Sequence, residues 1–178
     1  MKINESNIEK LKASIRNIPD YPKKGIMFKD ITPMLKDPML FSLCIDELCS
    51  KLSELEFDYI IGIESRGFIL GAAVAYKMHK GFVPARKKGK LPYKTISEEY
   101  KLEYGSETLE MHADAIEKNS RVVIIDDILA TGGTAAAAAK LAQKLGATIS
   151  CFCFAVELRQ FESRKIFNGE KIFSLVEF

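Results

Sequence analysis

The fold can be inferred from one stretch of the sequence, Val122-Val123-Ile124-Ile125-Asp126-Asp127-Ile128-Leu129-Ala130-Thr131-Gly132-Gly133-Thr134. Its apolar, β-branched start predicts a buried strand over residues 121–125, and a loop with two carboxylates and two glycines follows over 126–133. A helix is predicted over 134–145, closed by Gly146. A helix start behind glycines presents free backbone N–H groups and a partial positive charge, which suits a phosphate.

This motif lacks the fingerprints of the common nucleotide-binding loops. No Gly-Lys-Ser/Thr follows, as a P-loop requires, and no pair of glycines continues into the G-x-G-x-x-G pattern of dinucleotide folds. A capped helix after a core strand, with Asp126 and Asp127 as solvated cap residues, is the structural alternative, because Asp and Thr are ordinary cap residues. The motif by itself leaves both interpretations open.

Strands and helices alternate around the motif. A short apolar run over 59–63 and a polar turn over 64–67 precede a helix predicted over 68–77, and further strands are predicted over 82–85 and 148–156. Continuous apolar strands that alternate with helices indicate a parallel sheet covered on both faces. We therefore predict a doubly wound α/β domain with a mainly parallel sheet, and a ligand site at the carboxyl ends of its strands.

Two helices and a hairpin complete the expected layout. The first helix begins at the capping box Ser6-x-x-Glu9, and the second begins at Asp37-Pro38 and carries a broad apolar stripe. Residues 93–111 alternate polar and apolar side chains around Gly105 without a helical stripe. This alternation predicts a long exposed hairpin.

The composition is that of one folded domain. Hydrophobic residues make up 47% and charged residues 28% of the 178 residues, which argues against disorder and fibrous repeats. A formal net charge of +2 is too balanced for a protein that mainly neutralises nucleic acid. The longest apolar run, residues 67–76, covers only about half of the ~20 residues that cross a bilayer. We expect a cytoplasmic protein that binds neither nucleic acid nor membrane, with buried, reduced cysteines and no metal site built by the protein.

Three further stretches narrow the interpretation. They read YPKKGIMFKDITP over residues 21–33, GIESRGF over 62–68, and RKKGKLP over 86–92, which continues to LEYG over 102–105. Together with residues 122–134, and in the same order and at similar spacing, they resemble the adenine phosphoribosyltransferase family of type I phosphoribosyltransferases. The resemblance covers residues 21–157 and, more weakly, 172–175.

The resemblance implies a fold and a reaction. The fold is one domain over residues 1–178, with a small N-terminal hood over 1–35 and a basic loop and flexible flap hairpin over 87–115. The reaction belongs to purine salvage and transfers 5-phosphoribose from 5-phosphoribosyl 1-pyrophosphate to N9 of adenine, giving AMP and pyrophosphate. Mg²⁺ would be bound mainly through the pyrophosphate, and the family's shared sites imply a homodimer.

The same resemblance implies residues for the phosphates and the ribose. Asp126 and Asp127 hold the ribose hydroxyls, where carboxylates also help because cleavage of the C1–pyrophosphate bond builds positive charge on the ring. The 5′-phosphate is cradled by Ala130, Thr131, Gly132, Gly133 and Thr134. The pyrophosphate is held by Ser65, Arg66, Arg86, Lys87 and Lys90, of which the basic-loop residues reach the neighbouring subunit in this family. A solvated basic loop is the structural alternative for these cations.

The base has its own implied residues. Main-chain groups around Met27 and Lys29 recognise adenine, with Phe28 and Ile128 on its faces. Glu103, on the flap, acts near N7 as a general acid, which makes Glu103, Arg66, Asp126 and Asp127 the catalytic set. One of several exposed hairpin acids is the alternative for Glu103. Many relatives carry Arg where this chain has Lys29, a change that a backbone contact tolerates.

Two other functions compete with this one. A non-catalytic regulator that binds the same substrates would need a DNA-binding segment, but the first 20 residues hold one short helix and the net charge is small. A transferase for another 6-substituted purine is the second competitor, and the residues 102–105 argue against it.

Overall fold

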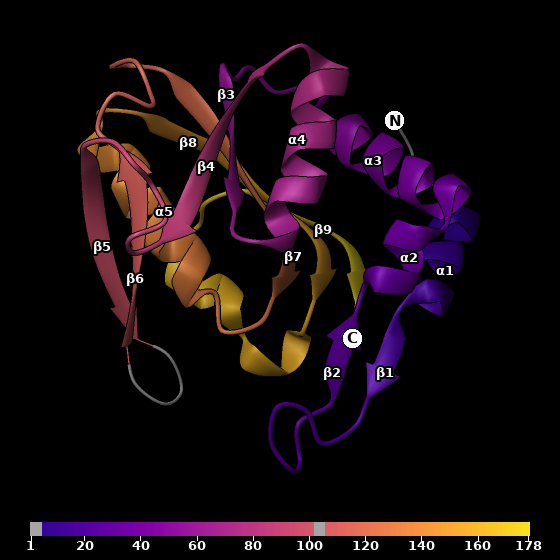
Figure 1. The fold of residues 1–178 in the computed structure, drawn as a ribbon. Helices are drawn as coiled ribbons and strands as arrows, with labels where there is room; N and C mark the ends of the chain where they lie inside the picture. Colours follow the sequence, from indigo (N-terminus) through magenta and orange to yellow (C-terminus); the bar gives the residue numbers. More distant parts are fainter. Residues whose placement is uncertain (1–4, 102–105) are drawn as a thin grey trace.

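The computed structural model describes residues 5–101 and 106–178, and within them one large sheet carries the fold (Figure 1). Its strand order is β5-β6-β4-β3-β7-β8-β9. The strands are β3 (Tyr59–Ile63), β4 (Gly81–Lys87), β5 (Thr95–Lys101), β6 (Ser106–His112), β7 (Arg121–Leu129), β8 (Thr148–Glu157) and β9 (Ile172–Glu177). Strands β3, β4, β7, β8 and β9 run parallel, and β6 pairs antiparallel with β4 and β5. The predicted α/β class with a mainly parallel sheet is confirmed.

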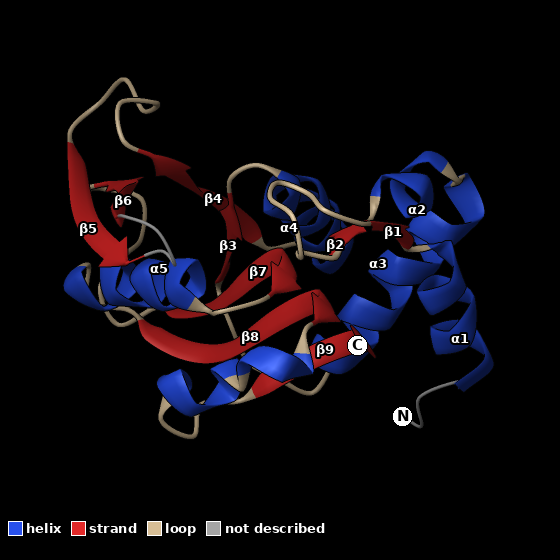
Figure 2. Cartoon of the chain, turned by 90° about the horizontal axis from the view of Figure 1, so that it is seen from below, coloured by secondary structure: helices blue, strands red, loops and turns tan. Residues whose placement is uncertain are grey.

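Helices cover both faces of the sheet (Figure 2). The side chains of Val122 and Ile124 on β7 join the core beneath α5 (Gly133–Lys144). Those of Val123 and Ile125 join the core beneath α3 (Pro38–Leu52) and α4 (Arg66–Met78). Successive residues of one strand thus enter opposite cores, which explains why the run is apolar throughout.

The N-terminal segment lies beside the sheet, and its buried side chains, among them Leu11, Ile31 and Met34, belong to the core beneath α3 and α4 (Figure 1). It consists of α1 (Glu5–Ser14), β1 (Arg16–Ile18), β2 (Phe28–Asp30) and α2 (Thr32–Lys36), and β1 pairs antiparallel with β2. Strands of three residues have no period that sequence inspection can detect, so neither was predicted. The salt bridge from Arg16 to Asp30 and the register Asn17↔Lys29 join the two strands.

Several predicted boundaries were wrong. Asp126 and Asp127 lie inside β7 and not in a loop, because β7 stays paired with β8 as far as Leu129↔Glu157. Helix α4 begins at Arg66, two residues before the predicted start. The basic residues Arg86 and Lys87 end β4, since they pair with Glu110 and Leu109 of β6.

The predicted hairpin is confirmed in β5 and β6, but one of its faces is not exposed. Tyr100, Leu109 and Met111 are buried in the core beneath α5. Lys144 of α5 donates to Glu98 Oε2 at 2.7 Å and Lys140 donates to Glu98 Oε1 at 3.0 Å, which fastens the hairpin to the helix. The alternating pattern therefore corresponds to a hairpin with one buried face and one exposed face.

The cysteines are free, as predicted. Cys44, Cys151 and Cys153 are buried, whereas Cys49 is only half-buried. Burial raises the pKa of Cys44 and that of Cys151 to about 12, so these thiols stay protonated and unreactive. Over residues 5–101 and 106–178, none of the helices has both the length and the apolar character that crossing a bilayer requires.

Candidate active site

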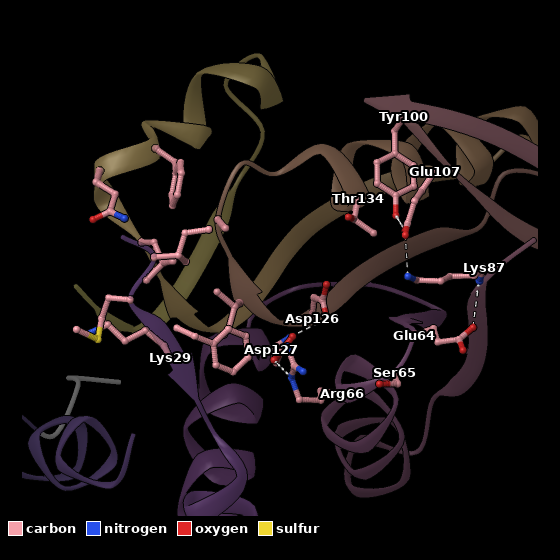
Figure 3. Close-up of a pocket in the computed structure, with 18 of the residues that line it drawn as sticks. Lys29, Glu64, Ser65, Arg66, Lys87, Tyr100, Glu107, Asp126, Asp127 and Thr134 are labelled. Carbon is pink, nitrogen blue, oxygen red and sulfur yellow. Dashed lines mark hydrogen bonds and ion pairs between the residues drawn. The ribbon is translucent and has the colours of Figure 1, made fainter. Parts of the chain in front are cut away.

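A cavity of about 920 Å³ opens at the carboxyl ends of β3 and β7, where the sequence places the ligand site (Figure 3). Its lining includes these predicted site residues: Met27, Phe28, Lys29, Ser65, Arg66, Lys87, Lys90, Asp126, Asp127, Ile128, Ala130 and Thr134. A second hollow of about 80 Å³ adjoins it and is lined by residues of the 126–135 stretch together with Phe154. Stretches that are far apart in the sequence thus meet at one edge of the sheet.

Two carboxylates stand at the end of β7. Asp127 is 5% exposed and its Oδ2 accepts a hydrogen bond from Nε of Arg66. The backbone N–H of Asp127 donates to Oδ1 of Asp126 at 2.9 Å. Burial, followed by the charge of Asp127, raises the pKa of Asp126 well above its usual range. The pair therefore offers both a fixed carboxylate and a group that holds its proton more readily.

Arg66 stands at the start of α4, on the turn that follows β3. Burial works against its charge, but the neighbouring carboxylates of Asp127 and Asp126 outweigh that effect and raise the pKa of Arg66. Gly67 explains how helix and strand come so close: a Cβ there would lie 2.8 Å from Oδ1 of Asp126 and 2.9 Å from the carbonyl oxygen of Ile125. A side chain at this position would push the turn away from the aspartates.

The stretch 130–134 forms the second hollow. Gly132 has φ +81° in the left-handed region and precedes α5 as its N-cap, without any side-chain hydrogen bond to the helix start. Thr131 and Gly132 line the hollow, and Ala130 and Thr134 line both cavities. Gly133 is the first residue of α5 and lines neither. The N–H groups of the first helical turn are thus available to an anion.

The basic residues separate into two groups. Lys87 and Lys90 line the large cavity, whereas Arg86 does not. The Arg86 guanidinium donates to Glu64 at 3.2 and 3.4 Å and to the Lys90 carbonyl at 3.0 Å. Adjacent residues of a strand point to opposite sides, and of these two only Lys87 lines the cavity, while Arg86 is held by two of the lining residues, Glu64 and Lys90.

Glu64 is the acceptor that holds this turn to β4. It also accepts a hydrogen bond from the backbone N–H of Lys87 at 3.0 Å. Burial works against the charged form of Glu64, but the hydrogen bonds from Arg86 and Lys87 outweigh it, and the pKa of Glu64 is lowered. Glu64 therefore stays ionised beside the cations of the cavity.

The N-terminal segment supplies the other side of the large cavity. The Lys29 ammonium donates to Oδ1 of Asn17 at 2.7 Å and lies 3.6 Å from the ring centroid of Phe178. The ring of Phe28 meets the ring of Tyr21 edge-on at 5.2 Å and lies 5.6 Å from Cζ of Arg66. With the Lys29 side chain engaged elsewhere, the backbone of Lys29 is what this residue can offer to a ligand.

Several lining residues were missed from the sequence. They are Gly25, Ile26, Glu64, Tyr100, Glu107, Leu158, Gln160 and Phe161. Gln160 and Phe161 belong to the short 3₁₀ segment η1 (Arg159–Phe161), and Leu158 directly precedes it. A second such segment, η2 (Ser163–Phe167), follows. The position of Leu158, Gln160 and Phe161 directly after the predicted strand over 148–156 was the available signal, since ligand sites in such folds gather behind strand ends.

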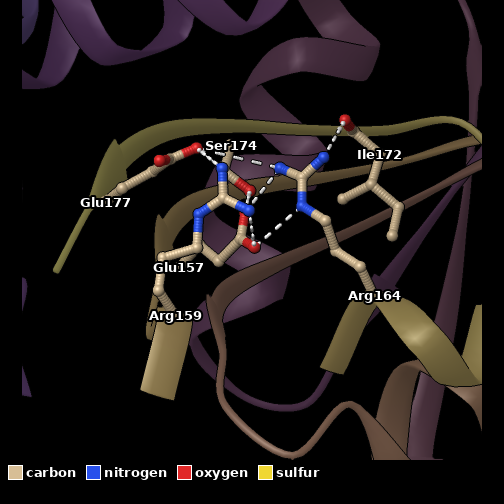
Figure 4. Close-up of polar contacts among 6 residues, drawn as sticks. All are labelled: Glu157, Arg159, Arg164, Ile172, Ser174 and Glu177. Atoms are coloured by element: carbon tan, nitrogen blue, oxygen red, sulfur yellow. Dashed lines mark hydrogen bonds and ion pairs between the residues drawn. The ribbon is translucent and has the colours of Figure 1, made fainter. Parts of the chain in front are cut away.

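A buried carboxylate holds that missed segment in place (Figure 4). Glu157, whose side chain is 2% exposed, accepts hydrogen bonds from Nε of Arg164 at 2.8 Å and from its second terminal nitrogen at 2.6 Å. The hydroxyl of Ser174 on β9 donates to Glu157 at 2.6 Å. Arg159 bridges Glu157 and Glu177. Burial opposes ionisation, but these donors outweigh it and lower the pKa of Glu157.

Two further predictions concern the general acid Glu103 and the absence of a metal site built by the protein. Glu103 falls in residues 102–105, outside the described part of the chain. Within the described residues, no group of three or more His, Cys, Asp or Glu side chains is arranged to hold a metal ion.

Comparison with known proteins identifies the class. Residues 33–172 match the phosphoribosyl transferase domain family, and the chain belongs to this family. The adenine phosphoribosyltransferase of Thermotoga neapolitana is 55% identical over 166 residues, which cover 93% of this chain and 98% of the relative. The crystal structure of adenine phosphoribosyltransferase from Thermoanaerobacter pseudethanolicus is 51% identical with a TM-score of 0.94, covering 96% of this chain and 99% of that one.

A further structure agrees. The adenine phosphoribosyltransferase of Saccharomyces cerevisiae, complexed with an imino-altritol bisphosphate and adenine, has a TM-score of 0.90 and 39% identity, covering 96% of this chain and 99% of that one. Within the family, the chain is therefore a member of the adenine phosphoribosyltransferases, with the type I phosphoribosyltransferase fold. The resemblance found in the sequence is confirmed.

Proposed function

We propose that the chain transfers 5-phosphoribose from 5-phosphoribosyl 1-pyrophosphate to N9 of adenine, forming AMP and pyrophosphate in the cavity described above. The observation that carries this proposal is the Asp126–Asp127 pair, which adjoins two turns suited to phosphate, residues 64–67 and 130–134. The substrate's ribose hydroxyls likewise stand near a phosphate at one end of the sugar and a pyrophosphate at the other.

The aspartates hold the ribose 2′ and 3′ hydroxyls. As the bond from C1 to the pyrophosphate oxygen breaks and a bond from adenine N9 to C1 forms, positive charge develops on the ring, and nearby carboxylates stabilise it. Arg66 orients Asp127 through their hydrogen bond. Arg66 and Ser65 also face the cavity, where they bind the leaving pyrophosphate.

The loop 130–134 and the start of α5 bind the 5′-phosphate. The hollow of about 80 Å³ combines a helix N-terminus with the hydroxyls of Thr131 and Thr134. Lys87 and Lys90 add positive charge on the side of the pyrophosphate.

Adenine binds against the N-terminal hood, with main-chain groups around Met27 and Lys29 at its edge and Phe28 and Ile128 at its faces. The Lys29 ammonium already contacts Asn17 and Phe178, which supports contact of adenine with the backbone of Lys29. Glu103 acts near N7 as the general acid that manages the base's proton. Replacing Glu103 by Gln should lower kcat far more than the KM for either substrate.

Mg²⁺ fits this cavity as an ion carried mainly by the pyrophosphate. It uses one or two carboxylates plus substrate phosphate oxygens, and Asp126 and Asp127 are the hard oxygen donors nearest the ribose site. When bound, it offsets the charge of the leaving pyrophosphate.

The enzyme works as a homodimer with shared sites. The outer face of α4 exposes Ile69 and Tyr76, the latter 85% exposed, at a spacing that places both on one side of the helix. Arg86 does not line its own cavity, and its Cζ lies 5.8 Å from the ring centroid of Phe68 on the same helix. A partner seated on α4 would receive Arg86 at its pyrophosphate.

One assay tests the reaction. The protein is mixed with adenine, 5-phosphoribosyl 1-pyrophosphate and Mg²⁺, and AMP and pyrophosphate are followed together. Equal amounts of both products are expected, and omission of either substrate should abolish them. No product with any purine would overturn the proposal and favour the non-catalytic regulator.

A second experiment tests the shared site. Chains carrying Asp127→Asn and Arg86→Ala are co-expressed with different tags, and the mixed dimer is isolated. Two-fold symmetry leaves one of its sites with both groups intact and the other with both defects. Activity should recover to about half of the wild-type dimer. A verified mixed dimer no more active than its parents would assign Arg86 to its own chain.

A further inference from the structure

One carboxylate in the cavity has no part in the reaction as proposed. Glu107, on β6, lines the cavity and is 33% exposed at its side chain. Its Oε1 accepts a hydrogen bond from Nζ of Lys87 at 2.9 Å, and its Oε2 accepts one from the hydroxyl of Tyr100 at 3.0 Å (Figure 3). Each of its oxygens is therefore engaged by a donor at ordinary hydrogen-bond distance.

The sheet holds Glu107 in this position. Tyr100 and Glu107 stand directly opposite each other in the pairing of β5 with β6, so the phenol fixes the carboxylate from its own hairpin. Lys87 reaches it from the end of β4, the neighbouring strand of β6. The contact therefore joins three adjacent strands.

This pairing has a consequence for the cation. The proposed function assigns Lys87 to the pyrophosphate. The Lys87 ammonium, however, is already paired with a carboxylate of the same chain, that of Glu107. Glu107 raises the pKa of Lys87 through this hydrogen bond and thereby keeps it charged. A pyrophosphate oxygen that binds Lys87 must take the place that Glu107 occupies, or share it at the cost of like-charge repulsion.

We propose that Glu107 competes with the pyrophosphate group for Lys87 and so sets how tightly the substrate is held and how readily pyrophosphate leaves. This inference rests on the proposed function and adds a residue to it. Binding exchanges one ion pair for another, so Lys87 contributes less affinity than it would without Glu107. When pyrophosphate leaves, Glu107 pairs with the Lys87 ammonium again, so that neither charge is left unpaired.

The experiment replaces Glu107 by Gln, which keeps the size and the acceptor for Tyr100 but removes the charge. Exposed and half-exposed ion pairs change an equilibrium by about two- to fivefold. The variant should bind inorganic pyrophosphate about two- to fivefold more tightly by calorimetry. The KM for 5-phosphoribosyl 1-pyrophosphate should fall by a similar factor, while the KM for adenine stays unchanged.

Two variants separate the contact from a general charge effect. Glu98→Gln removes the same charge from the same hairpin, but its partners are Lys140 and Lys144 of α5 and it does not line the cavity. Pyrophosphate affinity should not change in this control. Glu107→Asp keeps the charge with a shorter reach, so it should behave like Glu107→Gln if the contact matters.

A double substitution completes the test. In a Lys87→Met background, Glu107→Gln should have no further effect on pyrophosphate affinity, because the ammonium for which Glu107 and pyrophosphate compete is absent. Unchanged or weaker pyrophosphate binding in both Glu107 variants would overturn the proposal. So would an equal gain in Glu98→Gln. AMP formation by the wild-type protein is measured alongside, so that a failure of the proposed function is recognised separately from a failure of this inference.

Discussion

The two sides of the cavity are held in place by different means. The sheet wall, residues 64–67 and 126–134, consists of the ends of two buried strands and the helix starts that follow them. The outer wall, residues 25–29 and 158–161, consists of short segments at the rim. In the sheet wall, backbone pairing and a close approach at Gly67 set the geometry. In the outer wall, the backbone pairing is short, and side-chain hydrogen bonds and ion pairs add to it.

This difference determines what a single substitution can do. The Lys29–Asn17 contact ties β2 to β1, and the Glu157–Arg164 contact ties the end of β8 to η2, so each fixes one flank of the outer wall through a polar contact. Removing one such contact should loosen the wall without unfolding the sheet. The sheet wall also has side-chain contacts, Arg86–Glu64 and Arg66–Asp127, but the backbone pairing of β3 with β7 fixes it as well, so changes there should alter the chemistry of the site more than its position.

The largest expected effect concerns the outer wall's selectivity. If main-chain groups around Met27 and Lys29 meet the 6-amino group and N1 of adenine, hypoxanthine leaves two buried groups badly paired. Sites built on buried hydrogen bonds reject such a partner by ~10⁴. The measurement is kcat/KM for adenine and for hypoxanthine in one assay. Similar values would show that the outer wall does not read the base through its backbone.

The next effect concerns the sheet wall. Charge-assisted hydrogen bonds contribute about 1.5–3 kcal/mol each. Asp127→Asn should therefore lower kcat/KM by roughly one to two powers of ten, since about 1.36 kcal/mol is tenfold. Asp126→Asn should act likewise. Asp114→Asn, at an exposed position that does not line the cavity, is the control and should keep full activity. If the folded aspartate variants kept wild-type activity, the assignment of ribose binding to Asp126 and Asp127 would be wrong.

The same difference explains what could be predicted from the sequence. The sheet wall follows from the local order of a strand, two carboxylates, glycines and a helix, so residues 122–134 already indicate it. Its boundaries were wrong because the pairing of β7 with β8 as far as Leu129 depends on a distant strand. Segment 158–161 was missed because a three-residue 3₁₀ turn has no period, and its place depends on Glu157, Arg164 and Ser174 coming together.

A smaller effect comes from Glu157, the anchor of the outer wall. Glu157→Gln weakens hydrogen bonds to a charged group and should lower the free energy of unfolding by about 1.5–3 kcal/mol. It should also raise the KM for adenine severalfold and leave the KM for 5-phosphoribosyl 1-pyrophosphate unchanged. Leu158, Gln160 and Phe161 line the cavity, and the backbone of Arg159 bonds to Phe178, whose ring contacts Lys29 of the hood. Thermal unfolding and the two KM values are measured together. Equal increases in both KM values would mean that the two walls are not independent.

The pH dependence of that variant has a definite sign. The pKa of Glu157 is lower in the folded chain than its ordinary value of 4.5. Its stabilising contribution is therefore fully present above about pH 4.5 and is lost as the pH falls through the lowered folded value. The difference in stability between wild type and Glu157→Gln should be largest near neutral pH and should shrink below pH 4.5. A difference that grew on acidification would contradict the assignment of Glu157 as a stabilising carboxylate.

The smallest effect tests whether the outer wall is held through Lys29. Its ammonium bridges Asn17 and the ring of Phe178, so Lys29→Met removes both contacts and keeps the length of the side chain. A cation–π contact contributes about 0.5–1 kcal/mol at an exposed site, which is roughly a two- to fivefold change in an equilibrium. The KM for adenine should rise by about that factor, with kcat and the KM for 5-phosphoribosyl 1-pyrophosphate unchanged. Lys29→Arg keeps the charge and can reach the same partners, so it should restore the wild-type KM. If Lys29→Met instead lowers kcat while the KM for adenine stays the same, the side chain acts on the reaction itself and the backbone is not what this residue contributes.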